Sequence, residues 1–177
     1  RRSSHSPCRR MTATVPGVRA FVALGANIGE PVKHLRAAVV DLATLPGTRV
    51  AARSSLYRSA PVGLLNQPDF INAVVAIDTQ LAPLALLHQL LAIEARHGRV
   101  RSIPNAPRTL DLDLLLHGDT VLHDSELTLP HPRMHQRAFV LRPLLEIDAA
   151  LVLPGLGAAR DHLPAVADQD ISIFEPL

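Results

Sequence analysis

Short apolar runs alternate along the chain with apolar residues at helical spacing. Runs over 19–25, 50–57 and 70–79 predict strands, and a fourth strand follows Pro107. Two helices are expected between these strands. The first carries an apolar stripe of Leu35, Ala38, Val39 and Leu42, and the second, from Pro83 to Gly98, a stripe of Leu84, Leu87 and Leu91.

This order, strand-helix-strand followed by strand-helix-strand, predicts an α+β fold with a ferredoxin-like βαββαβ core. We expect a mainly antiparallel sheet with the helices packed on it. Beyond Gly118 the pattern weakens, and a small hairpin and a helix around 140–147 would form a C-terminal extension. We expect a single domain over 19–177, preceded by a disordered or cloning-derived tail at 1–18.

Charge is unevenly distributed. Hydrophobic residues make up 47% of the chain, and no apolar run approaches the roughly 18 residues of a membrane span, so we expect a soluble protein that binds no membrane. Four of the 18 basic residues lie within the first ten positions, which leaves 14 basic and 16 acidic residues in the body. A slightly acidic body argues against nucleic acid as a partner and favours one small polyanion. The single cysteine, Cys8, excludes an internal disulfide and favours a reducing compartment. We expect a cytoplasmic monomer.

The segment from Pro107 to Asp113 carries the strongest chemical signal. Side chains on a strand alternate between faces, so Thr109, Asp111 and Asp113 share one face and the intervening leucines the other. Two carboxylates whose α-carbons are roughly 6.5–7 Å apart can converge on divalent cations such as Mg²⁺. The alternative is a solvent-facing strand with two ordinary acids, but carboxylate repulsion and the apolar character of the strand argue against it.

Phe70 and Asn72 form a second candidate cluster because they share one face of their strand. A ring beside an amide can stack on a flat heterocycle and hydrogen-bond its edge. A core phenylalanine and an asparagine bonded to backbone would give the same pattern. Asparagine is depleted in strands, which weakens that alternative.

A third cluster, at the end of the second predicted helix, comprises Glu94, His97, Arg99 and Arg101. Charges at a helix end usually form a solvated face. These charges lie directly before the loop that leads into the aspartate strand, so they are also consistent with a clamp for a triphosphate.

Six motifs follow one another along the chain: L-G-A-N at 24–27, Y-R-S-A-P-V-G at 57–63, Q-P-D-F-I-N at 67–72, G-R-V-R at 98–101, P-R-T-L-D-L-D at 107–113 and P-H-P-R-M-H-Q-R-A-F at 130–139. Together they resemble the 6-hydroxymethyl-7,8-dihydropterin pyrophosphokinases of folate biosynthesis. The resemblance implies an ATP-dependent enzyme that moves the diphosphate of ATP to the hydroxymethyl group of the pterin and releases AMP. ATP, the pterin and two Mg²⁺ ions would be its ligands.

The resemblance also assigns roles to individual residues. Five charged side chains would carry catalysis: Arg99, Arg101, Arg108, Asp111 and Asp113, of which the two aspartates would hold the metal ions. ATP would contact Glu94, Arg101, Arg108, Leu114, Thr128, His131 and Arg137. The pterin would contact Ser59, Ala60, Val62, Phe70, Asn72, Asp111 and Phe139.

The chain departs from many members of this family in three places. It lacks a Trp before Pro107, and it has Leu91 and Glu126 where some members carry Gln and Arg. Two other functions stay open on the residues alone. The aspartate pair would also suit a two-metal phosphohydrolase or nuclease. A ferredoxin-like RNA-binding module would need aromatic residues on its sheet, but the chain has only four Phe, one Tyr and no Trp.

Overall fold

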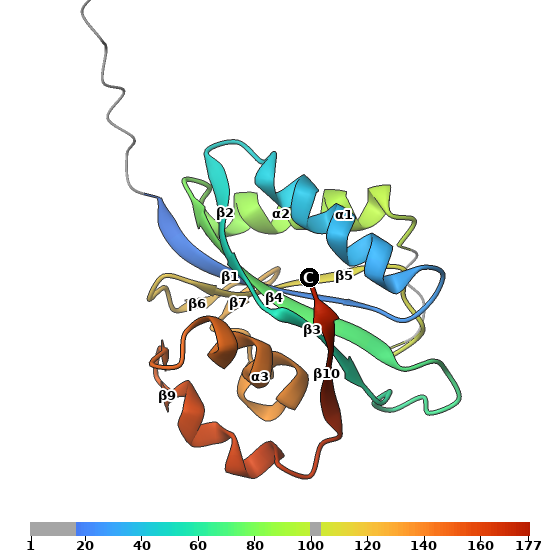
Figure 1. Ribbon diagram of the computed structural model, residues 1–177. Coiled ribbons are helices and arrows are strands. Elements are labelled where there is room, and N and C mark those ends of the chain that lie inside the picture. Colours follow the sequence, from blue (N-terminus) through green and yellow to red (C-terminus); the bar gives the residue numbers. More distant parts are fainter. Residues whose placement is uncertain (1–16, 100–103) are drawn as a thin grey trace, which may run out of the picture.

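The computed structural model describes residues 17–99 and 104–177, and its centre is a six-stranded sheet. The strands lie in the order β10-β3-β4-β1-β5, and β2 also pairs with β4 (Figure 1). The sheet strands are β1 (Val18–Ala26), β2 (Thr48–Arg53), β3 (Ser55–Ser59), β4 (Phe70–Thr79), β5 (Asp111–His117) and β10 (Ile171–Pro176). Two small hairpins add β6 (Leu122–His123), β7 (Thr128–Leu129), β8 (Val152–Leu153) and β9 (Gly157–Ala158). The helices are α1 (Pro31–Ala43), α2 (Pro83–Arg96) and α3 (Ala138–Ile147), with short 3₁₀ turns η1 (Met134–Gln136), η2 (Ala159–His162) and η3 (Pro164–Val166).

All strand pairs in the sheet are antiparallel. The predicted α+β fold with a mainly antiparallel sheet is therefore confirmed. Strand β1 begins at Val18, which pairs with Thr79, so the last residue assigned to the tail belongs to the sheet. The predicted strand over 50–57 is divided at Ser54, whose N–H donates to the carbonyl of Val74 and whose hydroxyl accepts from the N–H of Val74.

Two layers cover the two faces of the sheet (Figure 1). Helices α1 and α2 pack on one face, over a core that includes Leu24, Leu35, Leu42, Leu90 and Leu112. Helix α3 and the C-terminal segment pack on the other, over a core that includes Phe21, Val74, Leu115, Leu141 and Leu144. None of the helices in the described ranges is long and apolar enough to span a bilayer.

The predicted stripe of α1 is confirmed, because Leu35, Ala38, Val39 and Leu42 are the residues that it buries. The predicted stripe of α2 is confirmed only in part. Leu84 and Leu87 are partly buried and pack against the core, but the fully buried apolar residues are Leu86, Leu90 and Ile93, and Leu91 is 37% exposed. Apolar residues surround most of α2, so its sequence offers two faces with helical spacing, and only packing on the sheet selects between them.

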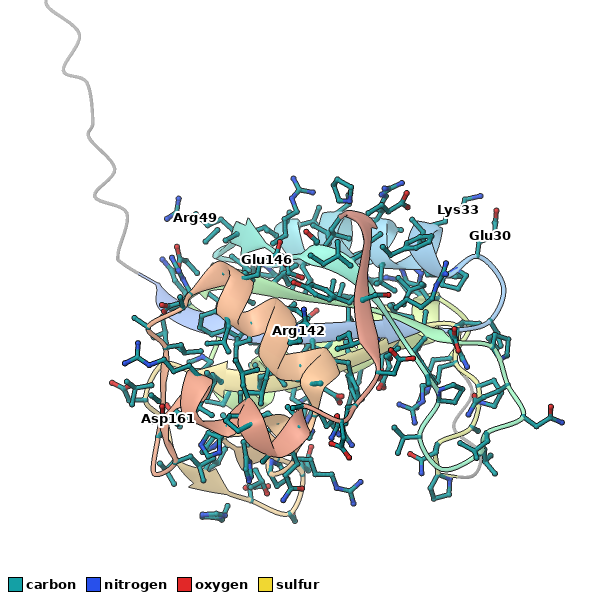
Figure 2. The ribbon with its side chains drawn as sticks, turned by 60° about the horizontal axis from the view of Figure 1, so that its bottom comes forward. Glu30, Lys33, Arg49, Arg142, Glu146 and Asp161 are labelled. Carbon is teal, nitrogen blue, oxygen red and sulfur yellow. The ribbon has the colours of Figure 1, made fainter. Side chains whose placement is uncertain are left out.

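Helix α3 is tied to strand β3 by Glu146, near the C-terminal end of the helix (Figure 2). The Glu146 carboxylate accepts hydrogen bonds from the N–H and hydroxyl of Ser55 and, at 2.6 Å, from the hydroxyl of Tyr57. Burial alone would raise the pKa of Glu146, but these hydrogen bonds outweigh it and lower the pKa. The anchor fixes α3 over the face that carries the two aspartates.

Candidate active site

Three neighbouring strands place the predicted site residues in one row. Gly25 of β1 pairs with Asn72 of β4 on one side and with Asp111 of β5 on the other. Because adjacent strands are about 4.8 Å apart, Asn72 and Asp111 are separated by roughly 10 Å. Because Gly25 has no side chain, the space between Asn72 and Asp111 stays open. A Cβ at Gly25 would lie only 3.3 Å from Oδ1 of Asn72.

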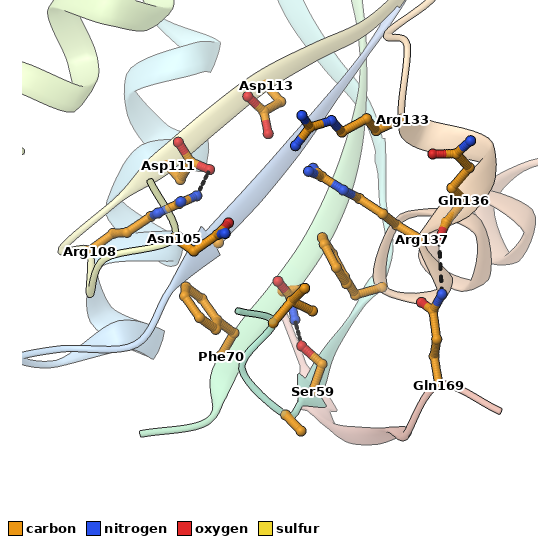
Figure 3. A pocket seen from close by; sticks show the side chains of 15 residues that line it. Ser59, Phe70, Asn105, Arg108, Asp111, Asp113, Arg133, Gln136, Arg137 and Gln169 are labelled. Carbon is orange, nitrogen blue, oxygen red and sulfur yellow. Dashed lines mark hydrogen bonds and ion pairs between the residues drawn. The ribbon is translucent and has the colours of Figure 1, made fainter. Parts of the chain in front are cut away.

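A cavity of about 450 Å³ opens above this row, on the sheet face that α3 covers. It brings together all seven residues expected to contact the pterin: Ser59, Ala60, Val62, Phe70, Asn72, Asp111 and Phe139. Arg108, Asp113 and Arg137 also line it (Figure 3). Segments far apart in the sequence therefore converge on one hollow, with aromatic and amide groups beside carboxylates and guanidinium groups.

The two aspartates lie on the cavity side of β5, as the alternation predicts, while Leu110, Leu112 and Leu114 lie in the opposite core. Asp111 accepts a 2.7 Å hydrogen bond from Nη1 of Arg108, and Nη1 of Arg99 is 3.7 Å from its other oxygen. The pKa of Asp113 is raised to about 6, first because the carboxyl is buried and second because Asp111 is negative. The ionised pair is therefore under-compensated by the protein alone.

An under-compensated carboxylate pair suits a bound divalent cation. Within the described ranges, no group of three or more His, Cys, Asp or Glu side chains is placed to hold a metal by itself. Mg²⁺ is commonly held by one or two carboxylates together with substrate phosphates and water, so two aspartates fit that ion. Nearby, Nε and Nη1 of Arg99 and Oγ1 of Thr109 are buried without a hydrogen-bond partner among the described residues. Such donors would suit phosphate oxygens.

The cavity has two walls of similar construction. On one side the guanidinium of Arg108 lies 5.9 Å from the ring centre of Phe70. On the other, the guanidinium of Arg137 lies 5.4 Å from the ring centre of Phe139. Each wall thus joins an apolar ring to a cation, and Arg108 and Arg137 approach from opposite sides (Figure 3). A flat ring that carries an anionic group would therefore find an aromatic ring to stack on and a guanidinium to pair with on both walls.

Asn72 is held in one orientation. Its Nδ2 donates a 2.7 Å hydrogen bond to Oγ of Ser59, and the residue is only 5% exposed. Within the described ranges no group donates to the amide oxygen of Asn72, so this oxygen can accept from a ligand in the cavity. The alternative in which Asn72 merely bonds to backbone does not hold, because its partner is a side chain of the cavity wall.

The L-G-A-N and Q-P-D-F motifs join the loops that border the site. Asn27 donates from Nδ2 to Oε1 of Gln67 and to the carbonyl of Pro68, and its Oδ1 accepts from the N–H of Arg108. Gln67 in turn donates to the carbonyl of Asn105. The loop that carries Ala60 and Val62 is therefore bonded to the loop that carries Arg108.

Two predicted ATP contacts lie beneath the site. Glu94 is 2% exposed, and its carboxylate accepts from the N–H of Leu112, so it joins α2 to β5. Leu114 is also 2% exposed and packs in the core under α1 and α2. Only the backbone of Leu114 could then meet a nucleotide. Both contacts with ATP stay predictions.

The remaining predicted residues lie at the margins of the cavity or outside the described part of the chain. Thr128 is half-buried in β7, beside β5. The pKa of His131 is lowered to about 4, by burial first and then by the charges of Arg137 and Arg133. Its Nδ1 accepts from the N–H of Arg133, so a neutral His131 carries its proton on Nε2 and can donate it to an anion. Arg101 lies outside the described residues.

The cavity is also lined by five residues that the sequence analysis did not assign to the site: Gly25, Asn105, Arg133, Gln136 and Gln169. Gly25, Arg133 and Gln136 occur within two of the motifs, and the pairing of β1 could have indicated Gly25. Nothing in the sequence around Gln169 indicates a place in the site.

A sheet that presents a ring-binding platform, a carboxylate pair and converging arginines in one cavity defines an enzyme that transfers a phosphate-containing group to a cyclic acceptor. A family model described as 7,8-dihydro-6-hydroxymethylpterin-pyrophosphokinase matches residues 21–149, and this chain belongs to that family.

Similar proteins agree with this assignment. The 2-amino-4-hydroxy-6-hydroxymethyldihydropteridine pyrophosphokinase of Haemophilus influenzae is 42% identical over 159 residues, which cover 90% of this chain and 99% of that protein. The enzyme of the same name from Pseudomonas aeruginosa is 50% identical over 136 residues, 77% of this chain and 84% of that protein. The HPPK-DHPS protein of Plasmodium falciparum has a similar fold, with a TM-score of 0.67 over 84% of this chain and 45% of that one, at 15% identity.

Proposed function

We propose that this protein transfers the diphosphate of ATP to the hydroxymethyl group of 6-hydroxymethyl-7,8-dihydropterin, in the biosynthesis of tetrahydrofolate. The hydroxyl oxygen loses its proton to solvent and bonds to the β-phosphorus of ATP, the bond from that phosphorus to the α-phosphate oxygen breaks, and AMP leaves. One observation carries the proposal. A single row across β4, β1 and β5 joins an amide and ring platform at Asn72 to a carboxylate pair at Asp111 and Asp113.

The pterin binds at the Asn72 end of the row. Phe70 and Phe139 enclose its flat ring, and the free amide oxygen of Asn72 accepts from the N–H groups on the ring edge. Ser59, Ala60 and Val62 complete this wall, with Ser59 holding the Asn72 amide in place. The hydroxymethyl group then extends over Gly25 toward β5, where no side chain blocks it.

The triphosphate binds at the other end, over Asp111 and Asp113. Two Mg²⁺ ions, held by these carboxylates and by phosphate oxygens, would neutralise phosphate charge and orient the β-phosphorus. Arg99 and Arg108 already contact Asp111 and can extend to the phosphates, as can Arg137 from the opposite wall. His131 donates from Nε2, while Arg101, Glu94, Thr128 and Leu114 border the nucleotide. Arg99, Arg101 and Arg108 then stabilise the charge that develops during transfer.

The experiment that tests this function is incubation with MgATP, with and without the reduced pterin, followed by separation of the nucleotides. We expect AMP to accumulate only when the pterin is present, in equal amount to a diphosphorylated pterin. Release of ADP or phosphate without pterin would instead indicate a phosphohydrolase. Retention of a single-stranded RNA, with no AMP formed, would indicate the RNA-binding module.

The number of metal ions and the state of the protein belong to the same proposal. Titration with Mn²⁺ in the presence of a nonhydrolysable ATP analogue should give two ions per chain, and one ion would contradict the pair. We also propose a monomer that acts in the cytoplasm. Light scattering after size-exclusion chromatography should give a mass near 19.1 kDa.

A further inference from the structure

One side chain from the C-terminal segment holds the backbone on both sides of Arg137. Oε1 of Gln169 accepts a 2.8 Å hydrogen bond from the N–H of Ala138. Nε2 of the same amide donates a 2.9 Å hydrogen bond to the carbonyl of Gln136. The two peptide groups that flank Arg137 are therefore bridged by Gln169, from 31 residues or more further along the chain.

The start of α3 needs such a partner. The first N–H groups of a helix have no acceptor within the helix, and a side chain at the N-cap often supplies one. Here the N-cap is Arg137, which makes no capping hydrogen bond and has an extended backbone, with φ −127° and ψ 115°. Gln169 supplies the missing acceptor in its place. Arg137 is thus the junction between η1 and α3, and Gln169 restrains the dihedral angles of that junction.

The restrained junction forms one wall of the cavity. Arg137 and Phe139 both line the cavity, and so do Gln136 and Gln169 (Figure 3). Rotation of the peptide before or after Arg137 would turn its guanidinium away from Asp113 and shift the ring of Phe139 with it. A small change in dihedral angle at a cavity wall moves the end of a long side chain by ångströms, which is enough to reduce catalysis.

The same segment also reaches the opposite wall. Ile171, two residues after Gln169, pairs with Ser59 at the start of β10. Ser59 holds the Asn72 amide at 2.7 Å. The segment 169–171 is therefore bonded to both walls between which the pterin is expected, although it lies beyond residues 21–149 that match the family.

We propose that Gln169 is a positioning residue of this enzyme, which fixes Arg137 and Phe139 in the geometry that binds the pterin and transfers the diphosphate. The inference rests on the proposed function. Gln169 acts through the backbone of its neighbours and needs no contact of its own with the reacting atoms.

The test compares Gln169→Met with Ser172→Ala. Methionine preserves the length of the side chain and removes both hydrogen bonds, whereas Ser172 is an exposed residue of the same segment. In Gln169→Met the pterin dissociation constant should rise about 3–10-fold, and turnover should fall by a similar factor. The affinity for a nonhydrolysable ATP analogue, measured without pterin, should fall by a similar or smaller factor, because Arg137 is also expected to reach the phosphates. The melting temperature should fall only slightly, because α3 loses one capping hydrogen bond. Ser172→Ala should match the wild type in every measurement.

A structural readout separates this inference from the function itself. The Ala138 amide should exchange with solvent faster in Gln169→Met than in the wild type, while amides in β4 should not change. Unchanged exchange at Ala138, or unchanged pterin affinity and turnover, would overturn the role of Gln169. A large drop in melting temperature, together with faster exchange of amides in β4 as well as at Ala138, would make Gln169 merely structural. Failure of the wild type to form AMP would overturn the proposed function. The exchange rate of the Ala138 amide would still report on its hydrogen bond to Gln169.

Discussion

The two faces of β5 differ sharply in the side chains that they bury. Toward α1 and α2, Leu110, Leu112 and Leu114 are at most 4% exposed and pack in a continuous apolar core. Toward α3, Asp111 and Asp113 repel each other, and Arg99 keeps buried donors without hydrogen-bond partners among the described residues. The leucine face stabilises the fold. The aspartate face destabilises it through carboxylate repulsion and these buried donors, which a charged ligand could compensate. The strand separates the two requirements by nothing more than the alternation of its side chains.

The largest effect should come from removing one charge on the aspartate face. We expect Asp113→Asn to lower turnover by about 10³-fold or more, as loss of a metal or phosphate contact does in phosphoryl transfer. The free enzyme should become more stable at pH 7. The raised pKa of about 6 means that the folded state favours the protonated form of Asp113, so ionisation of this carboxyl destabilises the fold. The free energy of unfolding of the wild type therefore falls as pH rises from about 4 to 6.

Single-turnover kinetics and thermal unfolding at pH 7 would measure both changes. Asp119→Asn, which changes an exposed aspartate in the turn that follows β5, is the matched control and should alter neither. Wild-type turnover in Asp113→Asn, or a lower melting temperature with turnover intact, would reverse the assignment of the two faces.

The opposite face should respond in the opposite way. Leu112→Ala leaves both aspartates in place and removes a side chain that is 4% exposed, so the free energy of unfolding should fall by about 2–5 kcal/mol. Denaturant titration would measure the loss. Well below the lowered melting temperature, the folded fraction should still form AMP. If the variant stayed as stable as the wild type, Leu112 would not belong to the core.

A third comparison concerns the pterin end of the row. Asn72→Ala should weaken pterin binding by about 1–3 kcal/mol, because a buried polar edge of the ligand loses its acceptor. Ser59→Ala should have a smaller effect in the same direction, since it only frees the Asn72 amide to rotate. Calorimetric titration with the pterin and with an ATP analogue would distinguish the subsites. If the variants lost ATP affinity and kept pterin affinity, ATP and not the pterin would bind over β4.

The smallest expected effect concerns the anchor of α3. The lowered pKa of Glu146 means that its ionised form contributes stability at neutral pH, and that this contribution disappears as pH falls through the lowered value. Glu146→Gln should therefore be slightly less stable than the wild type at pH 7, and the difference should be smaller at pH 3. Unfolding free energies at the two pH values would check this. A gap that persists at low pH would show that packing, and not charge, holds the helix.

Much of the fold followed from periodicity, and the site followed from motifs. The strand over 70–79 and the stripe of α1 were predictable because tertiary packing agrees with the local pattern. In α2 the local pattern fits two faces, so the prediction of Leu84, Leu87 and Leu91 held only in part. Packing leaves the first two partly buried and exposes Leu91. The seven residues predicted to contact the pterin lie within the motifs at 57–63, 67–72, 107–113 and 130–139. Gln169 lies in none, because its role depends on a hydrogen bond to Ala138 that sequence distance conceals.

The position of Gly25 between Asn72 and Asp111 also bears on how much sequence change this site can tolerate. Backbone hydrogen bonds set the spacing across β4, β1 and β5, and no side-chain substitution alters that spacing. Core residues can therefore be substituted while the distance between Asn72 and Asp111 persists. A shift of one residue in the register between β1 and β5 would be far more damaging than a substitution. It would turn both aspartates into the leucine core, so selection should tolerate many substitutions in these strands and almost no insertion or deletion.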